Sequence, residues 1–230
     1  TKVSAQVSSA FTDSLTGIQF QRFFGARTNF GFGIVLPPAT ALTNTNSFIG
    51  QLTFPLGTGG AGWGGFSLTG NMEGPLLMAA WSDGAGDVVS SFRQAFNEDD
   101  NPPEVTGSFT LKPIPTGTVV NNTFLAYTFL CEGCLDASLG LDGASATQDM
   151  GWALASRAVG NKASSAGVLG FHNSGFGDFR MNVQAARNAR FDEWAALAGT
   201  AVSASTGATP FDTTNAGGSD DEGDDGDDSD

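Results

Sequence analysis

Histidine and cysteine, common ligands of transition metals, are nearly absent from this sequence, which has one histidine and two cysteines. The cysteines stand close together in Cys131-Glu132-Gly133-Cys134, and two cysteines alone cannot complete a four-ligand zinc site. A thioredoxin-like redox pair would need a βαβ context, which the surrounding sequence lacks. A local disulfide is the simplest interpretation.

Basic residues are also scarce, with ten lysines and arginines against 24 acidic residues and a formal net charge of −14. Eight of the acidic residues lie within positions 220–230, and without those eight charges residues 1–218 carry a net charge of −6. This balance repels nucleic-acid phosphates and anionic membrane surfaces. No basic stripe with interleaved aromatic residues is present, so we expect neither nucleic acid nor a membrane as a partner.

Long hydrophobic runs are missing too. No stretch of about eighteen apolar residues occurs, which excludes a transmembrane helix. The sequence begins at Thr1 without a targeting segment, as expected of a mature, processed chain. The sequon Asn121-Asn122-Thr123 is compatible with N-glycosylation and secretion.

Glycine and phenylalanine, by contrast, are abundant, with 32 and 19 residues. Short runs of Phe, Val, Thr and Leu between clusters of Gly, Pro, Asn and Asp are typical of many short strands. A β-sandwich of this size is commonly a single domain, and we predict an all-β fold of about nine to eleven strands. The strand candidates are residues 18–23, 30–36, 48–55, 61–68, 76–81, 87–92, 107–111, 119–130 and 151–158.

The C-terminal part departs from this pattern. Residues 183–198 are rich in alanine, and Phe191, Trp194 and Leu197 are spaced three apart, which predicts a short helix. From residue 200 onward few apolar side chains are available to offset the entropy lost on ordering. We therefore predict one domain over residues 1–199 and a flexible acidic linker or tail over 200–230, which acts as a solvated spacer rather than a Ca²⁺ site.

Met72 and His172 are candidate ligands for a haem iron. His172 lies in the loop-like stretch 170–175, and Met72 lies in a similar stretch, 70–75. Imidazole and thioether are both ligands of haem iron, and the thioether tends to raise its reduction potential. Because two protein ligands leave no open position for a substrate, the pair indicates electron transfer.

Each of these residues has an ordinary alternative. A lone histidine is often structural, and a methionine often fills gaps in a core. The other sulfur donors lack the loop context of Met72, and we assign them to packing; they are Met78, Met150 and Met181. Asp83 and Asp87 resemble a glycosidase carboxylate pair, but surface turns explain them better.

Several further motifs occur in order along residues 10–195. They are Phe11-Thr12-Asp13, residues 16–20, residues 31–38, Phe48-Ile49-Gly50, residues 76–81 after Met72, residues 89–93, the cysteine pair, and Phe176-Gly177 after His172. In this order they resemble the secreted fungal b-type cytochrome domain that forms the N-terminal part of cellobiose dehydrogenase and accompanies other sugar dehydrogenases.

The resemblance implies an immunoglobulin-like β-sandwich that binds haem b non-covalently, with Met72 and His172 as axial ligands. Covalent attachment is excluded because no Cys-x-x-Cys-His occurs. The family's cysteine pair is a disulfide, in agreement with the interpretation of Cys131 and Cys134.

The function implied by the resemblance is that of a secreted, monomeric one-electron carrier. Its electron donor would be an attached or separate sugar dehydrogenase, flavin- or quinone-dependent, and its acceptor a copper-dependent lytic polysaccharide monooxygenase. The domain would have no catalytic residues of its own, although a multidomain enzyme would include it.

An apolar pocket around the iron would exclude water and control its potential. The candidate lining residues are Trp63, Phe66, Trp81, Phe171 and Phe176. The family's tyrosine that binds a haem propionate has no counterpart in residues 93–100. Arg190 or Arg187 is a candidate for that contact, and surface pairing with Asp192 or Glu193 is the alternative.

A haem-free carbohydrate- or protein-binding β-sandwich is the alternative from another class, because fold does not determine function. Replacing Met72 or His172 would then leave sugar binding intact. Oxygen chemistry at a haem is a third possibility, but it needs an open iron position, which double ligation denies.

Overall fold

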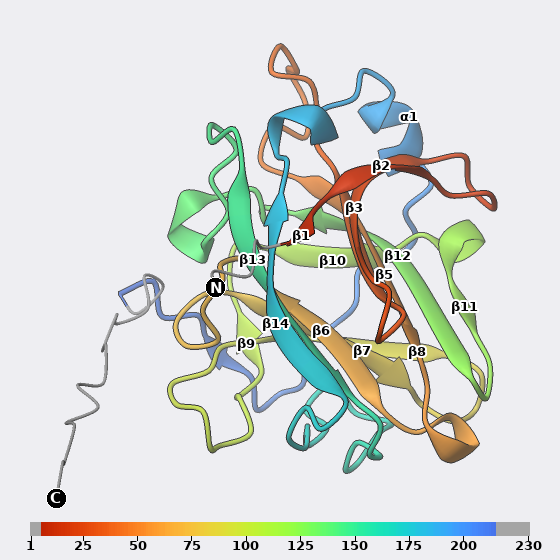
Figure 1. Ribbon diagram of the computed structural model, residues 1–230. Coiled ribbons are helices and arrows are strands. Elements are labelled where there is room, and N and C mark those ends of the chain that lie inside the picture. The colour runs from red at the N-terminus through yellow and green to blue at the C-terminus, as the bar shows by residue number, and fades with distance from the viewer. Residues whose placement is uncertain (1–5, 215–230) are drawn as a thin grey trace, which may run out of the picture.

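Short strands dominate the computed structural model, which describes residues 6–214 (Figure 1). They form two sheets that face each other across a hydrophobic interior, so the predicted β-sandwich is confirmed. The described residues contain a single α-helix, α1 (Phe191–Ala195). None of the helical segments within this part of the chain is long and apolar enough to cross a membrane.

The first sheet has six strands in the order β1-β14-β13-β6-β7-β8. Neighbours pair antiparallel, except that β1 runs parallel to β14. The strands are β1 (Gln6–Val7), β6 (Trp63–Ser67), β7 (Leu77–Ser82), β8 (Val88–Arg93), β13 (Gln148–Ala155) and β14 (Gly175–Met181).

The second sheet has seven strands in the order β10-β12-β5-β4-β3-β2, with β11 beside β12. The strands are β2 (Ser9–Thr12), β3 (Gln19–Gly25), β4 (Phe30–Val35), β5 (Phe48–Pro55), β10 (Thr110–Pro113), β11 (Val119–Val120) and β12 (Phe124–Glu132). The remaining elements are the parallel pair β9 (Val105–Thr106) and β15 (Thr209–Pro210), and the 3₁₀ helices η1 (Thr58–Gly60), η2 (Pro115–Gly117), η3 (Ala137–Leu139) and η4 (Gln184–Ala186).

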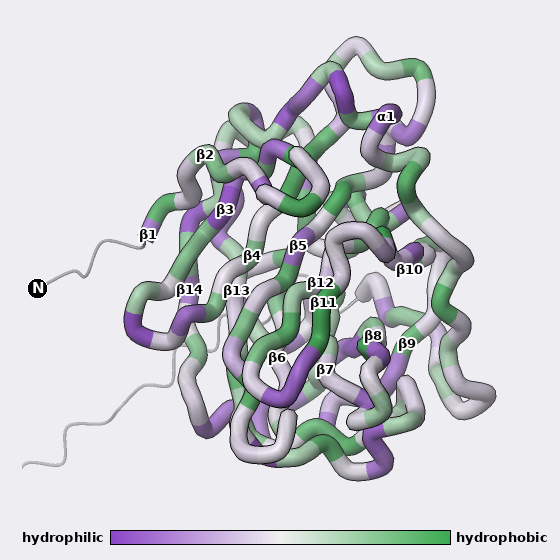
Figure 2. The backbone as a smooth tube through the Cα atoms, turned by 90° about the vertical axis from the view of Figure 1, so that its right-hand side faces the viewer, coloured by the Kyte–Doolittle hydropathy of each residue, from purple (hydrophilic) through white to green (hydrophobic). Residues whose placement is uncertain are grey.

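Phenylalanine fills the interior between the sheets. Phe32 of β4 stacks on Phe66 of β6 with ring centroids 3.9 Å apart, and Phe66 lies parallel to Phe129 of β12 at 6.2 Å. Figure 2 shows hydrophobic segments running through the strands of both sheets. Burial of these large apolar side chains stabilises the contact between the sheets.

The short helix α1 covers the outer face of the second sheet. Phe191 and Trp194 are buried there, in one cluster with Ile49 of β5 and Leu130 of β12. The spacing of three therefore located the buried face, but the helix is shorter than residues 183–198. Asn188 explains the late start, because its side chain accepts a hydrogen bond from the Arg190 backbone N–H at 2.9 Å, just before the first helical turn.

Residues 200–214, which we name the C-terminal strap, contradict the predicted boundary at residue 199. The backbone N–H of Val202 donates to Leu111 O at 2.8 Å, and β15 pairs with β9. Backbone hydrogen bonds to exposed strand edges therefore hold a segment that has few apolar side chains. The acidic run lies outside the described residues.

Candidate metal centre

Two loops attached to neighbouring strands carry the candidate ligands. The loop from β6 to β7 contains Met72, and the loop from β13 to β14 contains His172. Because β6 pairs with both β7 and β13, the strands that carry the two loops are neighbours in the first sheet.

Both loops border the outer face of the first sheet, which points away from the second sheet. Side chains alternate between the faces along a strand. Trp63 and Trp81 lie in an outer cluster with Val159 and Leu169 of the β13–β14 loop. At the other end of the same face, a side chain at Gly151 would meet the backbone oxygens of Thr69 and Gly70 at 3.3 and 3.5 Å. Both residues belong to the Met72 loop.

Small residues form the floor of the outer face. Ala153, Gly65 and Ala79 are direct neighbours across β13, β6 and β7, and Gly151 pairs with Ser67 in the next row. A side chain at Gly65 would lie 2.7 Å from the Met78 carbonyl oxygen. Glycine and alanine at these positions place no large side chain on this part of the outer face, beside the two tryptophans.

The backbone around His172 is held to the first sheet on both sides. Trp63 Nε1–H donates to Gly170 O at 3.0 Å, and the backbone N–H of Ser174 donates to Leu154 O at 3.0 Å. The imidazole ring lies against two aromatic rings, with centroid distances of 4.4 Å to Phe171 and 4.5 Å to Phe176. Contacts with β6 and β13 therefore fix the position of this histidine, although it lies in a loop.

The electrostatic surroundings of His172 favour its neutral form. Burial lowers the pKa of the imidazole, since desolvation disfavours the cation; an interaction with the backbone of His172 itself and the negative charge of Glu98 oppose this shift in part. Its Nδ1 atom is buried without a hydrogen-bond partner among residues 6–214. A neutral imidazole is the form that binds metal ions. A buried ring nitrogen without a hydrogen-bond partner on another described residue is consistent with a ligand at this position.

Met72 is held in a loop with a well-defined backbone. Ser67 Oγ–H is within hydrogen-bond distance of the carbonyls of Thr69 and Asn71, each at 2.7 Å, and Gly74 N–H donates to Ala95 O at 3.0 Å. The Met72 side chain is half-buried. Unlike a core methionine, this side chain is therefore partly accessible.

The other three methionines lie inside the sandwich, in the interior cluster between the sheets. Met78 is 1% exposed, and Met150 and Met181 are 0% exposed. Among the methionines, Met72 alone therefore lies outside the interior cluster.

The segment 95–101 contacts both loops, which the sequence analysis did not predict. Ala95 forms a β-bridge with Glu73, beside Met72. Further along the segment, Asn101 Oδ1 accepts from the Leu169 backbone N–H at 2.7 Å. Within it, Phe96 is 51% exposed. In the sequence, a phenylalanine among Asn, Glu and Asp residues marks this segment.

Comparison with known proteins identifies the fold and its family. Residues 11–193 match the family model of the cytochrome domain of cellobiose dehydrogenase. The chain belongs to this family. The expected resemblance is thus confirmed, and the protein is a cytochrome domain of the type found in sugar dehydrogenases.

The relatives of this cytochrome domain are parts of longer enzymes. A pyrroloquinoline quinone-dependent pyranose dehydrogenase of Coprinopsis cinerea is 30% identical over 144 residues, which are 61% of this chain and 19% of the relative. The chain therefore spans about a fifth of the length of the curated relatives it matches.

Two solved structures share the fold. The cytochrome b domain of the Coprinopsis cinerea pyranose dehydrogenase has a TM-score of 0.73 at 23% identity, over 88% of this chain and 98% of that one. The cytochrome domain of Myriococcum thermophilum cellobiose dehydrogenase has a TM-score of 0.72 at 28% identity, over 86% and 99%.

The predicted lining residues of the cytochrome domain divide into three groups. Trp63 and Trp81 lie on the outer face, where Trp81 is 0% exposed and its Nε1–H donates to Lys162 O at 2.8 Å. Phe171 and Phe176 are exposed by 64% and 63% beside His172. Phe66 instead belongs to the interior cluster between the sheets, so the expectation that it lines the site is wrong, because it faces the opposite side of β6 from Trp63.

The structure also places Arg190 away from the candidate ligands. Its guanidinium pairs with Glu193 at 2.7 Å and lies over the Trp194 ring, next to α1 on the outer face of the second sheet. That face is across the sandwich from the Met72 and His172 loops. The surface-pairing alternative is therefore the one observed. Arg187 donates to the carbonyls of Pro37 and Gly143.

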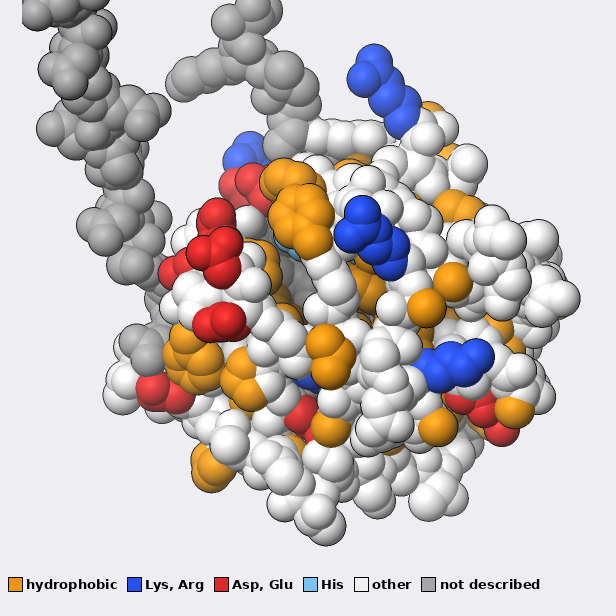
Figure 3. All heavy atoms as spheres, turned by 90° about the horizontal axis from the view of Figure 1, so that it is seen from below, with side chains coloured by type: hydrophobic (Ala, Val, Ile, Leu, Met, Phe, Trp, Pro, Cys, Tyr) orange, Lys and Arg blue, Asp and Glu red, His pale blue; other side chains and the backbone are white. Residues whose placement is uncertain are grey.

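Exposed hydrophobic and acidic side chains meet at the site. Figure 3 shows hydrophobic and acidic side chains around a hollow on the face seen from below, with basic side chains beside it as well. The exposed members on the described segments next to the ligands are Phe96, Glu98, Asp99, Asp100, Phe171 and Phe176. A partner that binds this face needs apolar contacts with a basic surround.

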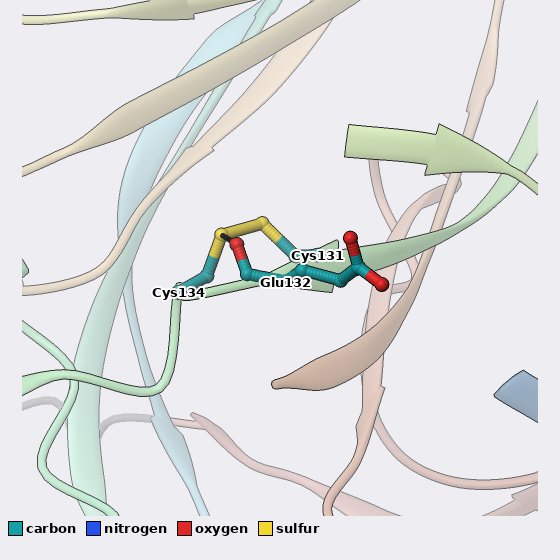
Figure 4. Close-up of a disulfide and its surroundings, with 3 residues drawn as sticks. All are labelled: Cys131, Glu132 and Cys134. Carbon is teal, nitrogen blue, oxygen red and sulfur yellow. Dashed lines mark hydrogen bonds between the residues drawn. A yellow bond between two sulfur atoms is a disulfide. The ribbon is translucent and has the colours of Figure 1, made fainter. Parts of the chain in front are cut away.

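Cys131 and Cys134 form a disulfide at the end of β12 (Figure 4). Their Cα atoms are 5.6 Å apart, and both residues are buried. The bridge closes a small loop, so it fixes the end of a strand and does little to restrict the unfolded chain.

Arg93 fastens the His172 loop to β8. Its buried guanidinium donates to the carbonyls of Pro102 at 2.9 Å, Ser165 at 2.6 Å and Gly167 at 2.8 Å. Burial lowers the pKa of Arg93 to about 10, and the negative charge of Glu104 opposes this shift. Arg93 therefore remains charged at neutral pH.

Replacing Arg93 by methionine is expected to lower the free energy of unfolding by about 3–5 kcal/mol, because three carbonyls lose their buried donor and the Glu104 charge loses a nearby cation. Urea denaturation measures this change. Arg180→Met is the control: Arg180 pairs with Asp149 on the surface, where ion pairs contribute little. Equal unfolding midpoints for the two variants would contradict the assigned role of Arg93.

Proposed function

We propose that this cytochrome domain transfers single electrons through a haem b held between Met72 and His172. The observation that carries the proposal is the neutral, partly buried imidazole of His172, whose Nδ1 has no partner among the described residues. It lies at one side of a floor of small residues, and the Met72 loop lies at the other.

The chemistry of these residues suits a haem. The floor around Gly65 and Ala153 suits a flat group, and Trp63, Phe171 and Phe176 supply apolar surface that excludes water from the iron. Imidazole and thioether donors suit iron. When bound, the haem supplies one-electron redox chemistry, and ligation by two side chains leaves no iron position for a substrate.

The proposed electron donor is a sugar dehydrogenase, either flavin- or quinone-dependent. Support comes from the pyranose dehydrogenase and cellobiose dehydrogenase relatives, whose cytochrome domains have the same fold. The proposed acceptor is a copper-dependent lytic polysaccharide monooxygenase. The domain itself breaks no substrate bond, and it acts as a monomer.

Stopped-flow spectroscopy tests this transfer. The haem-loaded ferric chain is mixed with a pyranose or cellobiose dehydrogenase and its sugar, and the haem band is followed. We expect reduction that requires both sugar and dehydrogenase, then reoxidation when a copper-loaded monooxygenase is added; the copper-free enzyme is the control. A chain that binds haem but exchanges no electrons with either protein would refute the proposal.

We also propose that the protein is secreted. Asn121 is exposed in a turn, and its Oδ1 accepts hydrogen bonds from the backbone N–H and the hydroxyl of Thr123 at 2.8 and 3.0 Å. The disulfide is of a kind that persists in oxidising compartments.

For a chain expressed through a fungal secretory pathway, we expect a glycan at Asn121. Intact mass before and after treatment with a glycan-releasing amidase measures it. Asn121→Gln should remove the mass difference, whereas Asn122→Gln should keep it. A secreted chain of unmodified mass would argue against modification at this turn.

A further inference from the structure

One buried glutamine connects the Met72 loop to the C-terminal strap. The Gln94 side chain is 0% exposed. Its Nε2 donates to Gly74 O at 2.7 Å and to Asp212 O at 2.8 Å, and its Oε1 accepts from the Asp212 backbone N–H at 2.9 Å. A single amide therefore bridges two segments that are more than a hundred residues apart in the sequence.

The strap has its own anchors on the domain, independent of Gln94. Thr209 N–H donates to Glu104 O at 3.0 Å, and Phe211 N–H donates to Thr106 O at 2.8 Å. The Phe211 ring meets the edge of the Phe109 ring at a centroid distance of 6.1 Å. These contacts place Asp212 firmly enough for it to orient the Gln94 amide.

At its other end, the Gln94 amide acts on the backbone two residues after the candidate sulfur ligand. Gly74 is buried and has φ 94°, a conformation that favours glycine. Its carbonyl accepts from Gln94, and its N–H donates to Ala95. The first half of the loop is held separately by Ser67. Loss of the Gln94 contact would therefore loosen the second half of the loop without unfolding it.

We propose that Gln94 is a positioning residue for Met72, and that the C-terminal strap holds it in place. The inference rests on the proposed haem site. The strap lies beyond the family match, which ends at residue 193, whereas Gln94 and the Met72 loop lie within it. A displacement of the strap would then alter the position of Met72 through the Gln94 side chain.

The test uses the full haem-loaded chain with Gln94→Glu, which retains the size of the side chain but loses the donor to both Gly74 O and Asp212 O. Carbon monoxide binding to the ferrous chain and the reduction potential are measured. We expect the ratio of iron without Met72 to iron with Met72 to rise about 5- to 150-fold, as for a lost buried hydrogen bond. Carbon monoxide binding should rise and the potential should fall, while haem remains bound through His172.

Two further variants make the result specific. Phe211→Ala, which weakens the strap but leaves Gln94 intact, should shift both quantities in the same direction. Gln184→Glu alters an exposed glutamine near η4 and should shift neither. Unchanged carbon monoxide binding and potential in Gln94→Glu or in Phe211→Ala would overturn the inference. A wild-type chain without haem would refute the proposed function instead.

Discussion

Replacing His172 by alanine is expected to weaken haem binding by more than about 100-fold. Loss of residues that only support a metal ligand already costs about 10- to 100-fold in affinity, and the loss of the ligand itself should cost more. The chain contains no second histidine to substitute. Titration of the haem-free protein with haem, followed by absorption, measures the affinity.

Imidazole in the buffer provides a control for this variant. The alanine side chain leaves space between Phe171 and Phe176, the two rings that pack against His172. Free imidazole should enter that space and restore a low-spin spectrum, which shows that the fold is intact. Wild-type haem affinity in His172→Ala would exclude this residue as a ligand.

Replacing Met72 by alanine is expected to keep the haem but open one position on the iron. His172 still binds, so the content of haem should fall much less than in His172→Ala. The spectrum should become high-spin, ferrous iron should bind carbon monoxide, and the reduction potential should fall, because the thioether raises it. Redox titration and carbon monoxide difference spectra measure these changes.

Met150→Leu is the matched control for the sulfur ligand. Met150 is 0% exposed within the interior cluster, and leucine preserves most of its volume. We expect an unchanged haem spectrum and only a small change in stability. If Met150→Leu opened the iron and Met72→Ala did not, the assignment of the sulfur ligand would be wrong.

The fold could be predicted from local patterns because those patterns have local causes. Short apolar runs between turn residues located most strands, and the spacing of Phe191 and Trp194 identified the side of α1 that is buried. The two candidate ligands were located by their loops, each with glycine nearby. Both loops connect strands of the first sheet.

The face of the sheet on which each side chain lies was harder to predict. Phe66 and Trp63 are three residues apart on β6 and therefore point to opposite faces. Both faces of this strand are buried, so the sequence has no alternation of polar and apolar residues to tell them apart. That explains why Phe66 was assigned to the site.

Contacts between distant segments could not be predicted from the sequence. The C-terminal strap is held by backbone hydrogen bonds to β9 and by Gln94, and these contacts leave no hydrophobic pattern. Arg190 was named as a candidate for its charge, with surface pairing as the alternative, and the choice between them depends on α1 packing against the second sheet. Both outcomes concern tertiary placement rather than secondary structure.

The visible absorption spectrum of the purified chain, loaded with haem and recorded before and after dithionite, tests the central claim most directly. The account predicts one haem per chain with a low-spin ferric spectrum, and sharp, split b-type bands after reduction. A chain that shows no haem absorption, although haem was adequate during expression, would contradict the account and leave the haem-free binding module as the better explanation.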